Sequence, residues 1–218
     1  MSKIALLFDM DGVIVDNHQF HYAAWVELCA KYDRPLNEAL YRENLNGRTL
    51  NEVVKYIFGE DTSQEQVKKI GKEKESLYRQ LYQPHLSPTL GLMQFLSEAG
   101  KNNIPMVVGT SAPLENVHFT LNGLGIWHHF KDILDERAVT VGKPNPEIYQ
   151  KCAAAAGLPN SQCVVFEDAV SGIKAGKSAG SKVIGLATSH TCDELDADLI
   201  IDNFRDLSLE QVRELIES

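Results

Sequence analysis

Two aspartates, Asp9 and Asp11, stand one residue apart where an apolar segment ends, in LLFDMDGVIVD. Residues i and i+2 of an extended chain point to the same side, so both carboxylates can face one site. A carboxylate can attack phosphorus as a nucleophile, and a second carboxylate can give and take the proton of the reacting oxygen. The pair therefore indicates phosphoryl chemistry, with one aspartate as nucleophile and the other as general acid and base.

Polar residues also follow other apolar segments. Thr110 and Ser111 follow IPMVVG, where their hydroxyl and N–H groups at the start of an expected helix would suit an anion. Lys143, in GKPNPE, adds a positive charge, and Glu167 and Asp168 follow CVVF. Carboxylate oxygens favour a hard cation, most simply Mg²⁺, which usually keeps waters and takes one or two carboxylates plus a phosphate oxygen.

Apolar runs and helical periodicity alternate along most of the chain. We expect strands at residues 3–8, 104–110, 130–135, 163–168, 181–187 and 197–202, and helices at 89–103, 112–125, 145–157, 169–180 and 208–217. This order predicts an α/β fold, a Rossmann-like doubly wound parallel sheet with helices on both faces. Ligands of such sheets bind outside the carboxyl ends of the strands, where the polar residues above are expected.

A helical insert interrupts this alternation directly after the first strand. Residues 17–86 contain four segments of helical periodicity and no convincing strand. We therefore expect a catalytic core formed by residues 1–16 and 87–218, and an inserted helical-bundle cap domain formed by residues 17–86.

The composition limits the classes of partner. Hydrophobic residues make up 44% and charged residues 23%, and 30 acidic against 21 basic residues give a formal charge of −9. This balance argues against nucleic acid and anionic membranes as main partners. The four cysteines lie far apart without a CxxC pair, which indicates free thiols in a reducing compartment. With no signal-peptide pattern and no apolar run of membrane-spanning length, we expect a cytoplasmic protein.

Four motifs carry a resemblance to a known family. DMDGV at residues 9–13, Thr110, Lys143 before a proline, and FEDA at residues 166–169 resemble the four motifs of the haloacid dehalogenase superfamily. Their order and spacing match over essentially the whole chain. A helical cap inserted after the first motif is similar to the subgroup of β-phosphoglucomutase and small sugar-phosphate phosphatases. The resemblance implies that Thr110 and Lys143 bind the transferring phosphoryl group.

The resemblance also implies roles for the acidic residues. Asp9 would be the nucleophile and a metal ligand, and Asp11 would be the acid/base and lend its backbone carbonyl to Mg²⁺. Asp168 would hold the metal, and Glu167 would do so either directly or through a neighbouring ligand. The aspartate at position 11 fits phosphoryl chemistry, because the dehalogenases of this superfamily lack it.

The resemblance points to three substrate-contacting residues in the insert. These are His21, Lys74 and Arg48, and the alternative for each is an ordinary polar residue in contact with solvent. Trp25, four residues after His21, fits the core of the cap better than a ligand contact. The substrate implied is a small phosphorylated molecule, and we expect the protein to act as a monomer.

The second phosphate site of a mutase is the point where the sequence departs from β-phosphoglucomutase. The arginine expected three residues after Gly47 is Leu50, with Arg48 displaced, and the expected Ser and Asn positions hold Ala112 and Leu114. A Mg²⁺-dependent sugar-phosphate phosphatase is therefore the favoured interpretation. β-Phosphoglucomutase, inorganic pyrophosphatase and a non-catalytic binding module remain alternatives. Incomplete matches to a nucleophile elbow (GTSAP) and to a P-loop (VGKP) make a serine hydrolase or P-loop NTPase less favoured.

Overall fold

The computed structural model describes residues 3–44 and 50–217. The chain forms two compact units: a core unit of Met1–Asp16 and Ser87–Ser218, and a helical unit of Asn17–Leu86. Each unit has its own hydrophobic core.

The core unit is built on a six-stranded sheet in which every neighbouring pair is parallel. The order is β3-β2-β1-β4-β5-β6, with β1 Ala5–Phe8, β2 Met106–Gly109, β3 Asp132–Leu134, β4 Cys163–Glu167, β5 Lys182–Leu186 and β6 Leu199–Ile201. The predicted parallel α/β fold is confirmed. Because all strands run in one direction, their carboxyl ends share one edge of the sheet.

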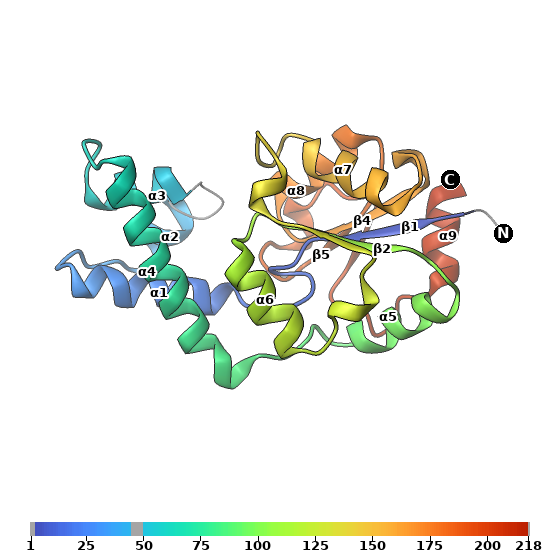
Figure 1. Cartoon of the computed structure of the whole chain (residues 1–218), viewed down its shortest axis with the longest axis horizontal. Coiled ribbons are helices and arrows are strands. Elements are labelled where there is room, and N and C mark those ends of the chain that lie inside the picture. The colour runs from blue at the N-terminus through green and yellow to red at the C-terminus, as the bar shows by residue number, and fades with distance from the viewer. Residues whose placement is uncertain (1–2, 45–49, 218) are drawn as a thin grey trace. The chain divides into compact units, whose positions relative to one another are not determined.

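Helices cover both faces of this sheet, as Figure 1 shows for α7 and α8 on one face and α5 and α6 on the other. The helices of the core unit are α5 Leu92–Lys101, α6 Leu114–Gly123, α7 Glu147–Ala156, α8 Val170–Ala179 and α9 Leu209–Glu217, which packs against α5. The sequence did not predict four short 3₁₀ helices, at Trp127–His129, Glu136–Ala138, Asn160–Gln162 and Cys192–Glu194.

The central strands are buried on both faces, which explains their uninterrupted apolar sequences. On one face Phe8 stacks on Phe166 with ring centroids 4.7 Å apart, and Phe95 of α5 meets Phe166 edge to face. On the opposite face Leu7 belongs to a buried cluster with residues of α7. Successive residues of β1 therefore pack into two different halves of the core.

The two chain segments that join the core unit to the helical unit are hydrogen-bonded to each other. The Thr89 N–H donates to the Ile14 carbonyl at 2.9 Å, and the Thr89 hydroxyl donates to the Val13 carbonyl at 2.7 Å. Thr89 is buried. The helical unit thus leaves and re-enters the core unit at adjoining points.

The helical unit contains α1 His18–Lys31, α2 Glu38–Asn44, α3 Leu50–Phe58 and α4 Gln64–Tyr82, followed by a 3₁₀ turn, Gln83–His85. Its core is formed by buried side chains of α1, α3 and α4: Trp25, Leu28, Cys29, Val53, Val54, Val67 and Ile70. Ser63 begins α4 with a reciprocal capping box to Gln66. The expectation that Trp25 packs in this core is confirmed.

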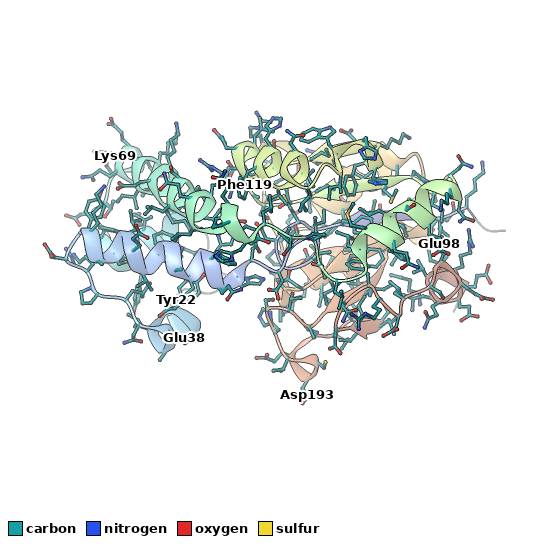
Figure 2. The ribbon with its side chains drawn as sticks, turned by 90° about the horizontal axis from the view of Figure 1, so that it is seen from below. Tyr22, Glu38, Lys69, Glu98, Phe119 and Asp193 are labelled. Atoms are coloured by element: carbon teal, nitrogen blue, oxygen red, sulfur yellow. The ribbon has the colours of Figure 1, made fainter. Side chains whose placement is uncertain are left out.

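Charged side chains line the outer faces of the helices. Figure 2 shows Lys69 on α4 and Glu98 on α5 projecting outward, and both residues are exposed. Among the described residues, no helix has both the length and the apolar character needed to cross a bilayer.

Candidate active site

Backbone hydrogen bonds continue beyond the central strands and fix the residues that follow them. The Asp9 N–H donates to the Phe166 carbonyl at 3.0 Å, which extends the pairing of β1 with β4. The Thr110 N–H donates to the Leu134 carbonyl at 2.9 Å, which extends the pairing of β2 with β3. The first residues after β1 and β2 are thus held as firmly as the strands themselves.

Lys143 reaches this edge of the sheet from the loop between β3 and α7. Its ammonium Nζ lies 2.9 Å from Asp9 Oδ1 and 2.6 Å from Glu167 Oε1, and it donates to the Gly109 carbonyl at 3.3 Å. The side chain is only 9% exposed. Burial by itself would lower the pKa of Lys143, but Asp9 and Glu167 hold that pKa above its ordinary value. Lys143 is therefore a fixed positive charge beside Asp9.

The carboxylate of Glu167 is completely buried and accepts hydrogen bonds on both oxygens. Oε1 accepts from Lys143 Nζ and from the Tyr149 hydroxyl, each at 2.6 Å. Oε2 accepts from the N–H groups of Asp168 (3.1 Å) and Ala169 (3.3 Å). Because four donors already occupy it, Glu167 is better placed to orient Lys143 than to bind a cation directly.

Asp9 is a buried carboxylate paired with Lys143. Its Oδ1 is buried and accepts no hydrogen bond of regular geometry from the described residues, although it forms the ion pair with Lys143. The pKa of Asp9 is raised to about 8: burial is the largest cause, Lys143 opposes it, and the charges of Glu167, Asp168 and Asp11 add to it. A bound divalent cation would favour the ionised carboxylate.

The acidic cluster at the strand ends fits Mg²⁺ by its donor chemistry. Asp9, Glu167 and Asp168 each place a carboxylate oxygen within 4.8 Å of the others, and all three residues are buried. Oxygen donors of this kind are those that Mg²⁺ prefers.

Asp11 lies in a tight loop directly after β1. The Met10 carbonyl accepts the N–H of Ile14 at 2.9 Å, and the Gly12 N–H donates to the Val15 carbonyl at 2.7 Å. Gly12 has φ +77°, a conformation that favours glycine. Thr188 lies just after β5, and its hydroxyl donates to the Gly12 carbonyl at 2.6 Å. This hydrogen bond connects the loop to the segment that follows β5. Asp11 itself is half-buried.

The structure corrects one expectation about Thr110 and Ser111. Helix α6 begins only at Leu114, so neither residue lies in its first turn, and the Thr110 N–H is used by Leu134. Thr110 is buried and its hydroxyl accepts the Ala112 N–H at 3.1 Å, whereas Ser111 is exposed. The prediction of an N–H anion site on Thr110 is therefore wrong, because the sheet uses that donor. The Thr110 hydroxyl is still positioned at the end of β2.

In the helical unit, the structure brings His21 and Lys74 together. Lys74 Nζ lies 2.6 Å from His21 Nδ1 and 2.9 Å from Glu75 Oε1. The His21 ring stacks on Tyr78 with centroids 3.9 Å apart. Lys74 is only 4% exposed, so the alternative of a solvated lysine is wrong. Arg48 lies outside the described residues.

Sequence reasoning did not identify two groups of supporting residues. Tyr149 donates to Glu167 from α7, and Thr188 and Ser189 donate to the carbonyls of Gly12 and Asp168 from the segment after β5. Tyr149 fits the apolar face of its helix, which hides its polar role. The position of Thr188 and Ser189 after a strand was the signal available for them, because every strand in this sheet ends at the same edge.

Comparisons with known proteins show which proteins the chain is similar to. A family model described as haloacid dehalogenase-like hydrolase matches residues 6–186. The chain is 30% identical to β-phosphoglucomutase of Bacillus subtilis, over 96% of this chain and 94% of that protein. It is 30% identical to a fructose-1-phosphate phosphatase of Escherichia coli, over 82% and 94% respectively. A crystal structure of a HAD hydrolase of family IA, variant 3, from Entamoeba histolytica superposes with a TM-score of 0.93 at 32% identity, covering 99% of this chain and all of that one.

Proposed function

The chain belongs to the haloacid dehalogenase-like hydrolases, and we propose that it is a Mg²⁺-dependent phosphatase of a small phosphorylated metabolite, specifically a sugar phosphate. The reaction would pass through a phosphoryl group covalently bound to Asp9. One observation carries this proposal: a buried carboxylate oxygen of Asp9 lies 2.9 Å from the buried ammonium of Lys143 at the carboxyl edge of the sheet. This geometry places a nucleophile beside a charge that attracts phosphate.

The proposed chemistry assigns one task to each residue of the edge. Asp9 attacks phosphorus, and Lys143 and the Thr110 hydroxyl bind the phosphoryl oxygens. Asp11 protonates the departing oxygen and then takes a proton from the water that hydrolyses the aspartyl-phosphate. Mg²⁺ held by Asp9, Asp168 and the Asp11 carbonyl would neutralise negative charge on the phosphoryl group. The helical unit would act as the cap that excludes water and contacts the leaving group.

The apolar residues at the mutase positions favour a phosphatase over a mutase. Ala112 and Leu114 offer no side-chain donor to a second phosphate. The side chain of Leu50 packs against Gly71 of α4, where it fills the space that a larger residue would need. A mutase must bind a second phosphate while the first is transferred, and these three side chains supply no charge for it. β-Phosphoglucomutase remains the second candidate because that relative matches nearly the whole chain.

A single incubation distinguishes these candidates. The protein is mixed with β-glucose 1-phosphate, Mg²⁺ and a trace of glucose 1,6-bisphosphate, and glucose 6-phosphate and free phosphate are measured together. Glucose 6-phosphate without free phosphate would identify a mutase and overturn the proposal. Free phosphate supports hydrolysis. If neither product forms, a panel of sugar phosphates and pyrophosphate identifies the substrate.

Removal of divalent cations should abolish turnover. We expect the protein to release p-nitrophenol from p-nitrophenyl phosphate with Mg²⁺, to lose this activity in EDTA and to recover it when Mg²⁺ is restored. The reason is that Asp9, buried among carboxylates, would otherwise keep its proton near neutral pH. Undiminished turnover after exhaustive EDTA dialysis would contradict the metal requirement, and no turnover on any phosphate ester would favour a non-catalytic module.

Replacing Lys74 with Met should change substrate preference more than basal hydrolysis. Lys74 is buried beside His21 in the helical unit, where a desolvated ammonium can bind a sugar hydroxyl strongly. We expect kcat/KM for the preferred sugar phosphate to fall about tenfold more than kcat/KM for p-nitrophenyl phosphate. The matched control is Lys69→Met, an exposed lysine of the same helix. Equal losses on both substrates, accompanied by a lower Tm, would show that Lys74 is only structural.

A further inference from the structure

We propose that Tyr149 is a positioning residue that holds the ammonium of Lys143 in register with Asp9. This inference rests on the proposed phosphoryl transfer at Asp9 and deepens it. Tyr149 lies in the first turn of α7, and it contacts Glu167 through its hydroxyl and Lys143 through its ring.

The hydroxyl of Tyr149 and the ammonium of Lys143 share one acceptor atom. Both donate to Glu167 Oε1 at 2.6 Å. The same ammonium lies 5.0 Å from the centroid of the Tyr149 ring, within the range of a cation–π contact. Tyr149 therefore contacts Lys143 directly through its ring and indirectly through Glu167.

Sharing Oε1 limits how strongly Glu167 can attract Lys143. A carboxylate oxygen that already accepts a phenolic hydrogen bond presents less negative charge to a second donor. This leaves Lys143 able to remain 2.9 Å from Asp9 while it also binds Glu167. Without the phenolic hydroxyl, the ammonium should move toward Glu167 and away from Asp9.

The surroundings hold the carboxylate of Glu167 in place. Its Oε2 accepts two backbone N–H groups, and the carboxylate packs against Gly172 of α8 so closely that no larger residue would fit there. Tyr149 and Glu167 are both 0% exposed, so water cannot replace the lost hydroxyl without a local rearrangement. Burial, followed by the charges of Glu167 and Asp9, raises the pKa of Tyr149 well above its ordinary value, so the phenol remains a neutral donor.

If Tyr149 had only a structural role, the packing of its aromatic ring would matter and its hydroxyl would not. Tyr149 packs in the buried cluster with Leu7, Val107 and Cys152, and this packing does not involve its oxygen. Tyr149→Phe therefore keeps the ring and removes the hydrogen bond to Glu167. Tyr82→Phe is the matched control, since Tyr82 is also buried but belongs to the helical unit.

The experiment compares wild type, Tyr149→Phe and Tyr82→Phe in four measurements. These are kcat and KM for p-nitrophenyl phosphate with Mg²⁺, the inhibition constant of inorganic phosphate, Tm, and the ¹H–¹⁵N spectrum of ¹⁵N-labelled lysine ammonium groups. The Lys143 signal is assigned by its loss in Lys143→Arg. For Tyr149→Phe we expect kcat to fall about tenfold with little change in KM, phosphate to inhibit more weakly, and the Lys143 signal to shift or broaden.

The outcomes separate this inference from the proposed function. If Tyr149→Phe leaves either the Lys143 signal or kcat as in wild type, the positioning role is overturned, even if Tm falls. If wild type neither hydrolyses the ester nor binds phosphate, the proposed function fails. In that case the Lys143 signal alone decides whether Tyr149 positions this lysine. Wild-type values in Tyr82→Phe are required for a tenfold loss to count as support.

Discussion

Asp9→Asn should remove turnover almost completely and yet stabilise the metal-free fold. We expect kcat to fall by at least about 10⁴-fold, as when a covalent nucleophile is removed from a hydrolase. The side chain keeps its size, so the loss would report the chemistry of the carboxylate. Burial and three neighbouring carboxylates oppose the charge of Asp9, and an amide removes that cost. Lys143 retains Glu167 as a partner.

The stability effect has a defined pH dependence. The folded-state pKa of Asp9, about 8, lies above its ordinary value of 3.8. The proton held by the folded protein therefore stabilises it fully below about pH 4, and this contribution is lost as pH rises through about 8. In EDTA, the Tm advantage of Asp9→Asn over wild type should grow between these limits. A lower Tm at pH 8, or substantial activity in a preparation free of wild type, would contradict the assignment of Asp9.

Asp11→Asn should slow both the transfer of the phosphoryl group to Asp9 and the hydrolysis of the aspartyl-phosphate. How much each step slows should depend on the substrate. Loss of a general acid and base costs about 10²–10⁴-fold in rate. p-Nitrophenolate leaves without a proton, so the phosphoryl group should still reach Asp9, but hydrolysis of the aspartyl-phosphate lacks its base. We expect a burst of p-nitrophenol equal to the enzyme concentration, followed by slow turnover. A sugar leaving group needs the proton, so a sugar phosphate should give no burst.

Rapid-mixing kinetics test this prediction. Asp16→Asn is the matched control, because Asp16 belongs to the same segment but is exposed and should leave kcat unchanged. If Asp11→Asn raises only KM, with kcat and the pre-steady-state phase as in wild type, the acid/base role is wrong.

The architecture was predictable because it depends on patterns that the sequence displays. Uninterrupted apolar runs mark strands buried on both faces, and the alternation with helices requires a parallel sheet. From this it follows that Asp9, Thr110 and Asp168, each directly after a strand, meet at one edge. Lys143 does not follow a strand directly, because the 3₁₀ helix Glu136–Ala138 lies between it and β3, so its place at the site needed the family resemblance in addition to the pattern.

Other features of the site depend on tertiary contacts that no local pattern contains. Lys74 stands in GKEKESLY, a charged stretch, yet its side chain is buried beside His21 of α1. Tyr149 satisfies the helix pattern of an ordinary core residue, while its hydroxyl bonds a carboxylate on a distant strand. The N–H of Thr110 was expected to serve an anion, but the pairing with β3 uses it. In each case the deciding partner is remote in sequence.

The hydrogen bonds of Thr89 to Val13 and Ile14 have a consequence for how such a chain can acquire or exchange its helical unit. From the standpoint of the core unit, the whole helical unit is a loop whose two ends are already closed by these bonds. The entropy of closing a loop grows only with the logarithm of its length, so a large insert costs the core little more than a short connection. The strand ends that carry the chemistry can therefore persist while the inserted segment changes in size and sequence. Recognition of the leaving group would then evolve on a segment whose length has little effect on the stability of the core unit.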